Sequence, residues 1–467
     1  MRVSLIMDDK RERLLNLLKR EQKKFLPLTP AQERLWRMEQ GCKGRPVYII
    51  PGAIRFRGEL NLVAFRRSLD YLVERQEVLR ITFTVVQQQV LQVLTSMKAA
   101  LTVLDLESFP PSQRQSLSQN YLVQELETPF DLSCGPLFRT LLLRLSSHDW
   151  IVLFNLHNII VDGWSMGIFY EELSQVYDAF CKGLPAPLSP LGLRYQDFVR
   201  ELTSEFKGTR LAEATAYWRR TFQNLPDLTL PPVRNRDLNN SHNGGSLDVR
   251  IDRTQTIALQ TFAQSQRVTL FMVLLAVFSI CLHRYFQVEK LVIATPTANR
   301  DRSDLEGLMG LLVNVLVLPI DLRGNPTYRT ILSRIRAVTV QAYAHPQVPF
   351  NQLLPDLPFP EPDARNPLAH FLLAYHGFSL KPLAFPNLEM ESLKYPIKTS
   401  RYELGLHLWE NTKTHLSSTS AEHGGLSGTF FYGSARFDSV MVEQIISKFQ
   451  QVLQQMIAQP DACLSEK

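Results

Sequence analysis

The segment Leu156-His-Asn-Ile-Ile-Val-Asp-Gly-Trp-Ser-Met-Gly167 lies between two stretches of different character. Before it, Trp150–Leu156 is an apolar run rich in β-branched and aromatic residues, which predicts a buried strand. After it, apolar residues recur with the spacing of one helix face, at Ile168, Phe169, Leu173, Val176 and Phe180. We therefore expect a strand, a polar loop over His157–Gly163 and a helix, in that order.

Strand and helix patterns alternate through the rest of the chain. The predicted helices cover Leu62–Gln76, Val268–Arg284 and Val440–Ile457. The sequence Thr29-Pro-Ala-Gln32 fits a capped helix start. The predicted strands cover Leu291–Thr295 and Leu311–Pro319, beside a β-rich stretch from Val78 to Leu94. This alternation is typical of an α/β protein.

Proline-rich segments divide the chain. A length of 467 residues predicts two to three domains, at about 150 residues each. The prolines of residues 183–190 and 225–232, with the polar stretch 239–245, enclose a helical segment and are typical of a connection between lobes. We predict an N-terminal lobe over residues 1–182, a crossover region over 183–245 and a C-terminal lobe over 246–467.

Charge and composition narrow the function classes. The net charge is +6, from 51 basic and 45 acidic residues, and the basic residues are dispersed, so nucleic acid is not an expected partner. The longest apolar run, Val268–Leu282, is shorter than the roughly 20 residues that span a bilayer. The start of the chain lacks the apolar core of a signal peptide, and the five cysteines form no C-x-x-C pair. We expect a cytoplasmic protein with no metal site and no membrane contact.

The residues of the segment His157–Gly167 are, by themselves, compatible with two kinds of chemistry. Gly163-Trp-Ser-Met-Gly167 matches the G-x-S-x-G pattern, in which a strained turn exposes the nucleophile of a serine hydrolase. However, several polar residues separate Ser165 from the strand, and a serine here also suits a helix N-cap. Alternatively, His157 and Asp162 place an imidazole and a carboxylate at one site for acid–base chemistry. A histidine at a strand end equally suits a structural hydrogen bond.

The loop resembles the H-H-x-x-x-D-G motif of the condensation domains of nonribosomal peptide synthetases, which are akin to chloramphenicol acetyltransferase. Six other stretches resemble the remaining motifs in the family's order: Leu28–Trp36, Arg75–Phe83, Tyr195–Phe198, Thr295–Arg300 with Gly310–Asn314, His345–Phe350 and Arg365–Leu368. The resemblance covers nearly the whole chain.

This resemblance implies an α/β fold of two chloramphenicol-acetyltransferase-like lobes in a V, each with a mixed sheet covered by helices. It also implies an acyltransferase that joins acyl or aminoacyl thioesters through an amide bond, with an ester bond as the second choice. Two carrier proteins, or neighbouring synthetase domains, would deliver these groups on phosphopantetheine arms. We expect a monomer that binds no cofactor of its own and acts in secondary-metabolite biosynthesis, free-standing or within a larger synthetase.

The resemblance also assigns site residues. The catalytic centre would comprise His157, Asn158, Asp162 and Gly163. The tunnel and the lobe interface would comprise Trp164, Ser165, Arg300 and Asn314. Among these, Asp162 is expected to form an ion pair with Arg300 of the other lobe, and the N–H of Gly163 is expected to help hold the oxyanion.

Asn158 departs from the motif, because the family has its second histidine at this position. An amide does not accept a proton near neutral pH, so the loss of a general base would cost roughly 10²–10⁴ in rate. An orienting amide would still hold the amine beside the thioester. His157 is a poor substitute, because neighbours on an extended segment point to opposite faces. The alternative to an enzyme is therefore a catalytically silent module that binds carrier proteins or recruits a partner enzyme.

Overall fold

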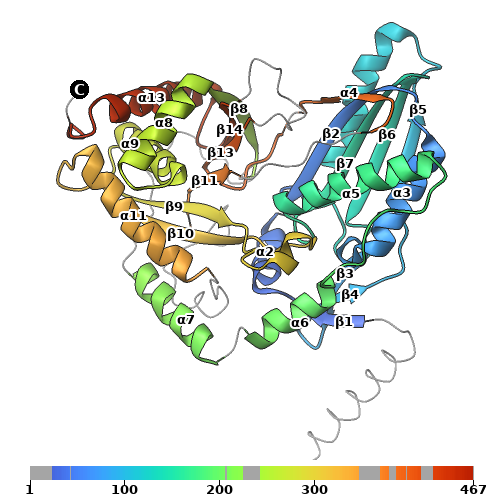
Figure 1. Cartoon of the computed structure of the whole chain (residues 1–467), viewed down its shortest axis with the longest axis horizontal. Helices are drawn as coiled ribbons and strands as arrows, with labels where there is room; N and C mark the ends of the chain where they lie inside the picture. The colour runs from blue at the N-terminus through green and yellow to red at the C-terminus, as the bar shows by residue number, and fades with distance from the viewer. Residues whose placement is uncertain are drawn as a thin grey trace, which may run out of the picture.

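The computed structural model describes residues 24–42, 44–205, 208–223, 242–346, 369–377, 385–395, 397–411 and 424–465. Figure 1 shows two lobes, each a β-sheet with helices against it, that diverge toward the top of the view. All or part of the segments 225–232 and 239–245, and of the motif stretches His345–Phe350 and Arg365–Leu368, lies outside the described residues.

The first lobe holds a five-stranded mixed sheet in the order β12-β2-β7-β6-β5. Its strands are β2 (Ile49–Gly58), β5 (Ala100–Asp105), β6 (Phe138–Ser146), β7 (Asp149–His157) and β12 (Leu388–Ser392). β5 and β6 run parallel, and the other neighbours run antiparallel. The covering helices are α3 (Leu62–Arg75) and α5 (Gly163–Cys181) on one face and α4 (Pro111–Glu127) on the other (Figure 1).

Strand β7 is apolar on both faces because helices cover both. Val152 and Phe154 belong to the core shared with α3 and α5, whereas Ile151 and Leu153 belong to the core shared with α4. This burial on two sides explains why the strand reads as one continuous apolar run rather than as an alternating one. The predicted strand is confirmed and extends by one residue at each end.

A three-stranded sheet, β1-β4-β3, supports the helix that approaches the second lobe. Its strands are β1 (Lys24–Pro27), β3 (Ile81–Val86) and β4 (Gln89–Leu94), with the short 3₁₀ helix η1 (Glu77–Arg80) before β3. Helix α2 (Pro30–Gly41) begins with the predicted capping box of Thr29 and Gln32. The Gln32 amide also donates to Gln92 Oε1 at 2.9 Å and to Ile159 O at 3.1 Å. These bonds tie α2 to the loop that carries Asn158.

The second lobe holds a six-stranded mixed sheet in the order β10-β9-β11-β13-β14-β8. Its strands are β8 (Gly244–Ile251), β9 (Lys290–Thr297), β10 (Asn314–Asp321), β11 (Phe371–His376), β13 (Leu404–Glu410) and β14 (Leu426–Gly433). Its helices are α8 (Arg253–Ser265), α9 (Leu270–Phe286), α11 (Tyr328–Ala344) and α13 (Ser439–Ala458). The helices predicted at 268–284 and 440–457 are confirmed as α9 and α13, with ends shifted by two residues or fewer.

Several segments cross between the lobes. Helix α6 (Tyr195–Glu205) packs into the first core, and α7 (Gly208–Gln223) packs into the second through Trp218 and Phe222. Strand β12 returns from the C-terminal half of the chain to pair with β2. The segment that contains the short helix α10 (Ser303–Glu306) also reaches the first core. The two lobes are therefore linked by exchanged segments as well as by contacts.

Strand β10 begins later than predicted. The sequence pattern places its start at Leu311, but the strand begins at Asn314. The N–H groups of Leu312 and Val313 donate to Asp162 Oδ2, at 3.1 and 3.2 Å. A buried carboxylate therefore takes the hydrogen bonds that an earlier strand start would have given to a neighbouring strand.

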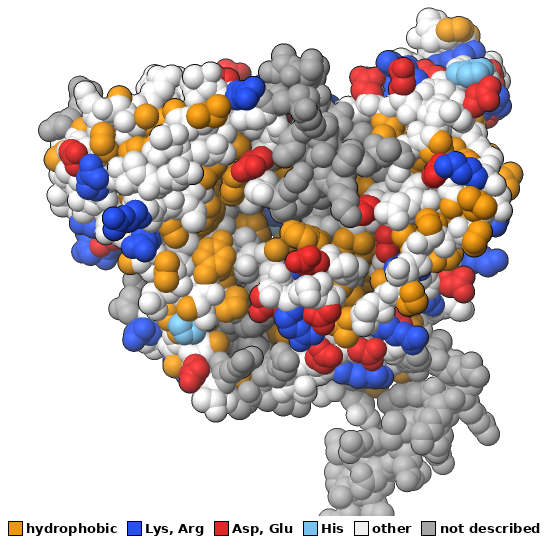
Figure 2. Space-filling model, in the orientation of Figure 1, with side chains coloured by type: hydrophobic (Ala, Val, Ile, Leu, Met, Phe, Trp, Pro, Cys, Tyr) orange, Lys and Arg blue, Asp and Glu red, His pale blue; other side chains and the backbone are white. Residues whose placement is uncertain are grey.

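The outer surface carries charges of both signs. Figure 2 shows basic and acidic side chains interspersed over this face of both lobes. Within the described part of the chain, no single helix is long and apolar enough to cross a bilayer, and α8 with α9 meets the length and composition only as a pair bent by 104°.

Candidate active site

The loop between β7 and α5 is fixed at both of its ends. The Asn158 N–H donates to Tyr48 O at 2.8 Å, which continues the pairing of β7 with β2. Asp162 caps α5 by accepting the N–H of Ser165 at 2.9 Å. The residues between these anchors are therefore held in set positions.

His157 points away from Asn158, as the extended backbone predicts. Its side chain is 2% exposed, and its Nδ1 accepts the N–H of Ile159 at 3.1 Å. Its Nε2 lies 3.5 Å from Glu39 Oε2, and its ring meets Phe130 edge-on. Because Nδ1 accepts a hydrogen bond, the neutral ring carries its proton on Nε2. His157 therefore has a structural arrangement, with no lone pair left for a substrate.

Asp162 and Arg300 form a buried ion pair across 138 residues of sequence. Nη1 and Nη2 of Arg300 donate to Oδ2 and Oδ1 at 3.0 and 3.1 Å, and the two side chains are 1% and 2% exposed. The carboxylate also accepts the N–H and the hydroxyl of Ser165 and the N–H groups of Leu312 and Val313. The expected ion pair is present, and structural donors occupy the carboxylate.

Ser165 lies inside this same network. Its side chain is fully buried, and its Oγ bonds to Asp162 Oδ1 at 2.8 Å and to the carbonyl and N–H of Gly310 at 2.9 and 3.0 Å. A nucleophilic serine needs an adjacent base, and none of the described partners of Ser165 is a histidine. The alternative role as N-cap is wrong as well, because Asp162 occupies that position and Ser165 lies three residues further on.

We expect an activated fluorophosphonate to leave Ser165 unmodified, because the buried hydroxyl lacks both access and a base. Intact-protein mass spectrometry after incubation checks this, with an unrelated serine hydrolase in parallel to show that the probe is active. A mass increase that disappears in Ser165→Ala would contradict the expectation.

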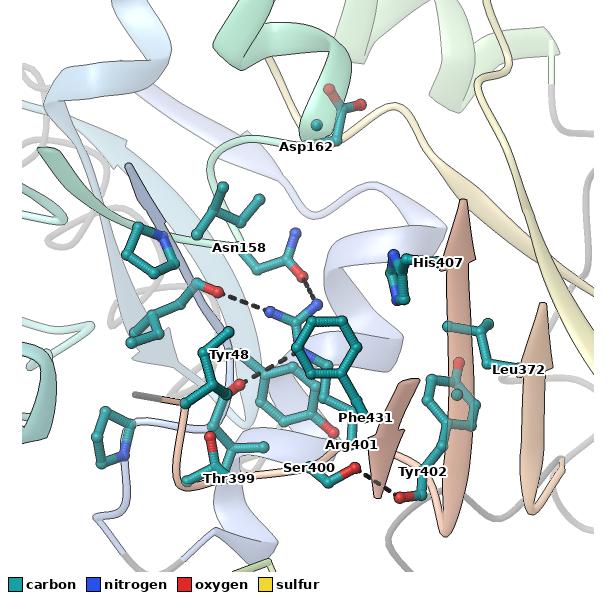
Figure 3. Close-up of a pocket in the computed structure, with 18 of the residues that line it drawn as sticks. Tyr48, Asn158, Asp162, Leu372, Thr399, Ser400, Arg401, Tyr402, His407 and Phe431 are labelled. Atoms are coloured by element: carbon teal, nitrogen blue, oxygen red, sulfur yellow. Dashed lines mark hydrogen bonds between the residues drawn. The ribbon is translucent and has the colours of Figure 1, made fainter. Parts of the chain in front are cut away.

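A cavity of about 480 Å³ lies between the lobes. Asn158 and Asp162 line it from the first lobe, and His407 of β13 lines it from the second (Figure 3). Gly163 and Trp409 line it as well. A Cβ added to Gly163 would meet no atom of the described residues within 4 Å, so the first residue of α5 borders open space. Most of the lining surface is apolar, which suits an organic acyl group better than a free ion.

Arg401 meets Asn158 inside this cavity (Figure 3). Its Nη1 donates to Asn158 Oδ1 at 2.7 Å, and Asn158 Nδ2 donates to Val161 O at 2.9 Å. The rest of the guanidinium donates to Val47 O at 3.2 Å and to Ile49 O at 2.8 Å. Burial lowers the pKa of Arg401. The amide is thus fixed on both sides, yet it retains one lone pair on Oδ1 and one N–H on Nδ2 for a ligand.

Stacked rings form the opposite wall. His376 stacks on Trp409 at 5.0 Å between centroids, and its Nε2 lies 3.4 Å from His407 Nδ1. Burial, His376 and the charge of Arg401 together lower the pKa of His407 well below 6.5, so this ring is neutral at pH 7. Sequence reasoning missed these residues and Arg401. The available signal was the alternation of Gly405, His407 and Trp409 along β13, which places all three on the cavity side.

Trp164 and Arg300 bind across the lobe interface, whereas Asn314 bonds within the second lobe, and none of the three lines this cavity. Trp164 Nε1 donates to Glu306 O at 2.9 Å, and Asn314 Nδ2 donates to Pro346 O at 2.8 Å. Arg300 lies behind Asp162, 5.6 Å from the Trp164 ring. In the part of the chain that the structure describes, no three His, Cys, Asp or Glu side chains gather as a metal site.

Comparison with known proteins decides the family. A protein-family sequence model, described as Condensation domain, matches residues 22–467 of the chain. The chain belongs to the condensation-domain family. The family prediction and the predicted fold of two lobes with mixed sheets are therefore confirmed.

Curated relatives of this condensation domain are large synthetases. It is 36% identical over 439 residues to one of the linear gramicidin synthase proteins of Brevibacillus parabrevis, covering 93% of this chain and 8% of that protein. It is 34% identical over 441 residues to malpibaldin synthetase of Mortierella alpina, covering 93% of this chain and 8% of that protein. The chain thus spans less than a tenth of the length of these relatives.

Solved structures share the fold of this condensation domain at lower sequence identity. The X-domain from teicoplanin biosynthesis has a TM-score of 0.82 at 23% identity, covering 94% of this chain and 96% of that one. The first condensation domain of the calcium-dependent antibiotic synthetase, solved with a substrate analogue, has a TM-score of 0.75 at 19% identity, covering 95% and 99%. At these identities the likeness shows the fold alone.

Proposed function

We propose that this condensation domain joins two carrier-tethered thioesters through an amide bond. The acceptor's neutral amine attacks the carbonyl carbon of the donor thioester and the C–N bond forms. The C–S bond then breaks, the sulfur of the donor arm leaves as a thiolate, and the proton lost by the amine ends on that sulfur. The observation that carries the proposal is the cavity between the lobes, with Asn158 and Gly163 on one wall. An ester, from a hydroxyl acceptor, is the second choice.

Positioning is the contribution that we propose for Asn158. Its remaining lone pair on Oδ1 accepts an N–H of the attacking amine, and its fixed amide holds that amine in line with the thioester. Intramolecular positioning of this kind is worth a large effective concentration. The Gly163 N–H, at the N-terminus of α5, is our proposed donor to the oxyanion.

Carrier proteins and neighbouring synthetase domains are the proposed partners, and phosphopantetheine arms are the proposed carriers of substrate. The homology to synthetases supports this assignment, because the chain matches only one part of each relative. We further propose that the domain is a monomer in the cytoplasm, divided at residues 183–245, and that its charge of +6 favours acidic carrier surfaces.

The test is a single-turnover experiment with one donor-loaded and one acceptor-loaded carrier protein, followed by mass spectrometry of the acceptor arm. We expect the condensed thioester to form well above the rate of the two carriers alone. If no product forms while both carriers still bind, amide formation is overturned.

A silent docking module is the second candidate, and Asn158 is the observation that favours it. The motif's base is absent, and one structural neighbour is an X-domain in complex with OxyB. This candidate predicts carrier or enzyme binding without product in the same experiment. Product from the unaltered protein would exclude it.

A further inference from the structure

The charges of the described side chains that line the cavity do not sum to zero. Among the residues that the structure describes, five charged side chains line it: Arg34, Glu127, Asp162, Lys398 and Arg401. Asp162 pairs with Arg300 at 3.0 Å, and Glu127 pairs with Lys398 at 2.6 Å. These two pairs are internally neutral, so two guanidinium groups, those of Arg34 and Arg401, remain.

Arg34 has the less satisfied guanidinium of the two. It extends from α2, and the structure gives it neither a hydrogen bond nor an ion pair with any described residue; its buried Nε is an unpartnered donor. Enclosure by the protein lowers its pKa, while the nearby Tyr48 and Tyr402 act in the opposite sense. The side chain as a whole is half-buried in the cavity wall, and a cation there for which the described residues provide no acceptor favours an anionic ligand.

Arg401 is held by neutral oxygens. Its hydrogen bonds end on the carbonyls of Val47 and Ile49 and on the amide of Asn158, none of which carries charge. Glu39 acts on its pKa from beyond ion-pair distance. Even if Glu39 offsets the charge of Arg401, no acidic residue in the described part of the chain pairs with Arg34.

We infer that the cavity binds an acyl group that carries a carboxylate, with Arg34 as the direct partner of that carboxylate and Arg401 as the second positive group. This inference rests on the proposed function, because it names the class of acyl substrate. A guanidinium binds a carboxylate through two parallel hydrogen bonds. The apolar and aromatic remainder of the lining, with Trp409 and Phe431, suits the hydrocarbon body of such an acyl chain.

The experiment compares two ligands that have the same shape and differ in charge. The N-acetylcysteamine thioesters of glutaric acid and of glutaramic acid are titrated against the unaltered protein by calorimetry. We expect the carboxylate to bind about 10- to 100-fold more tightly than the amide, as for a charge-assisted hydrogen-bonded pair. Equal affinities would overturn the inference, and this arm needs no variant.

Variants then locate the effect. Arg34→Met is expected to reduce the preference for the carboxylate to less than about 3-fold, with thermal melting as the check on folding. Arg37→Met is the matched control, because Arg37 is exposed on the same helix; it is expected to keep the preference. A preference that survives Arg34→Met would overturn the assignment to Arg34.

The anion's source and the proposed function are tested separately. If 4′-phosphopantetheine without an acyl group binds with the same dependence on Arg34, the site holds the phosphate of the arm, and the acyl assignment is overturned. If neutral and acidic acyl groups are condensed at equal rates, the inferred carboxylate site is overturned, whereas the proposed function stands. Charge-selective binding without product in the single-turnover experiment overturns the proposed function and leaves the binding site standing.

Discussion

Asp162→Ala is expected to lower the free energy of unfolding by about 3–5 kcal/mol, the range for breaking a buried ion pair by removing one partner. The change leaves the Arg300 charge enclosed, and it removes the acceptor for the N–H groups of Leu312 and Val313 and for the cap of α5. A urea titration followed by tryptophan fluorescence measures the loss.

Asp304→Ala is the matched control, because Asp304 forms an exposed ion pair with Arg302 in the same segment as Arg300. Its expected effect is much smaller than that of Asp162→Ala, because solvent screens an exposed pair. A double variant, Asp162→Ala with Arg300→Met, is expected to lose less than the sum of the two single variants, because the unpaired charge is gone. An unchanged unfolding midpoint for Asp162→Ala would contradict a structural role.

The parts of the fold that the sequence predicts are those where one local rule decides the outcome. The β7 run is buried on two faces, and the start of α2 has a complete capping box, so hydrophobic pattern and capping chemistry alone place them. The predicted start of β10 is wrong because it depends on a residue far away in the sequence. Its deciding partner, Asp162, lies 150 residues away, and no window of local sequence contains it.

The candidate site likewise has one part that the sequence predicts and one part that it does not. The loop His157–Gly163 and the Arg300 pair follow from motifs, but Arg401 lies 243 residues from Asn158 and just before an ordinary strand. Its role comes from tertiary packing, which brings it against the carbonyls of Val47 and Ile49. A pattern of residue types does not encode that geometry.

Asn158→His is expected to raise the single-turnover rate constant by about 10²-fold or more, within the range for general-base catalysis. Asn158 Nδ2 donates to Val161 O, and an imidazole Nδ1–H in its place makes the same bond. That bond fixes the tautomer and leaves the Nε2 lone pair for the amine. The positive charge of Arg401 lowers the pKa of the new histidine, so the ring is neutral near pH 7.

The pH profile separates a new base from a general improvement. Both proteins need a neutral amine, whose ordinary pKa is about 7.7–8.0, so both rates rise through that range. In the variant the added rate requires the unprotonated imidazole; it is therefore present above the pKa of that histidine and is lost as the pH falls through it. His407 adds no inflection here, because burial holds its pKa well below 6.5.

Asn158→Leu is the control, since it removes both side-chain bonds and supplies no base. If the unaltered protein and Asn158→His turn over equally, with the same pH profile, proton transfer at this position does not limit the rate, and the amide's positioning alone accounts for catalysis.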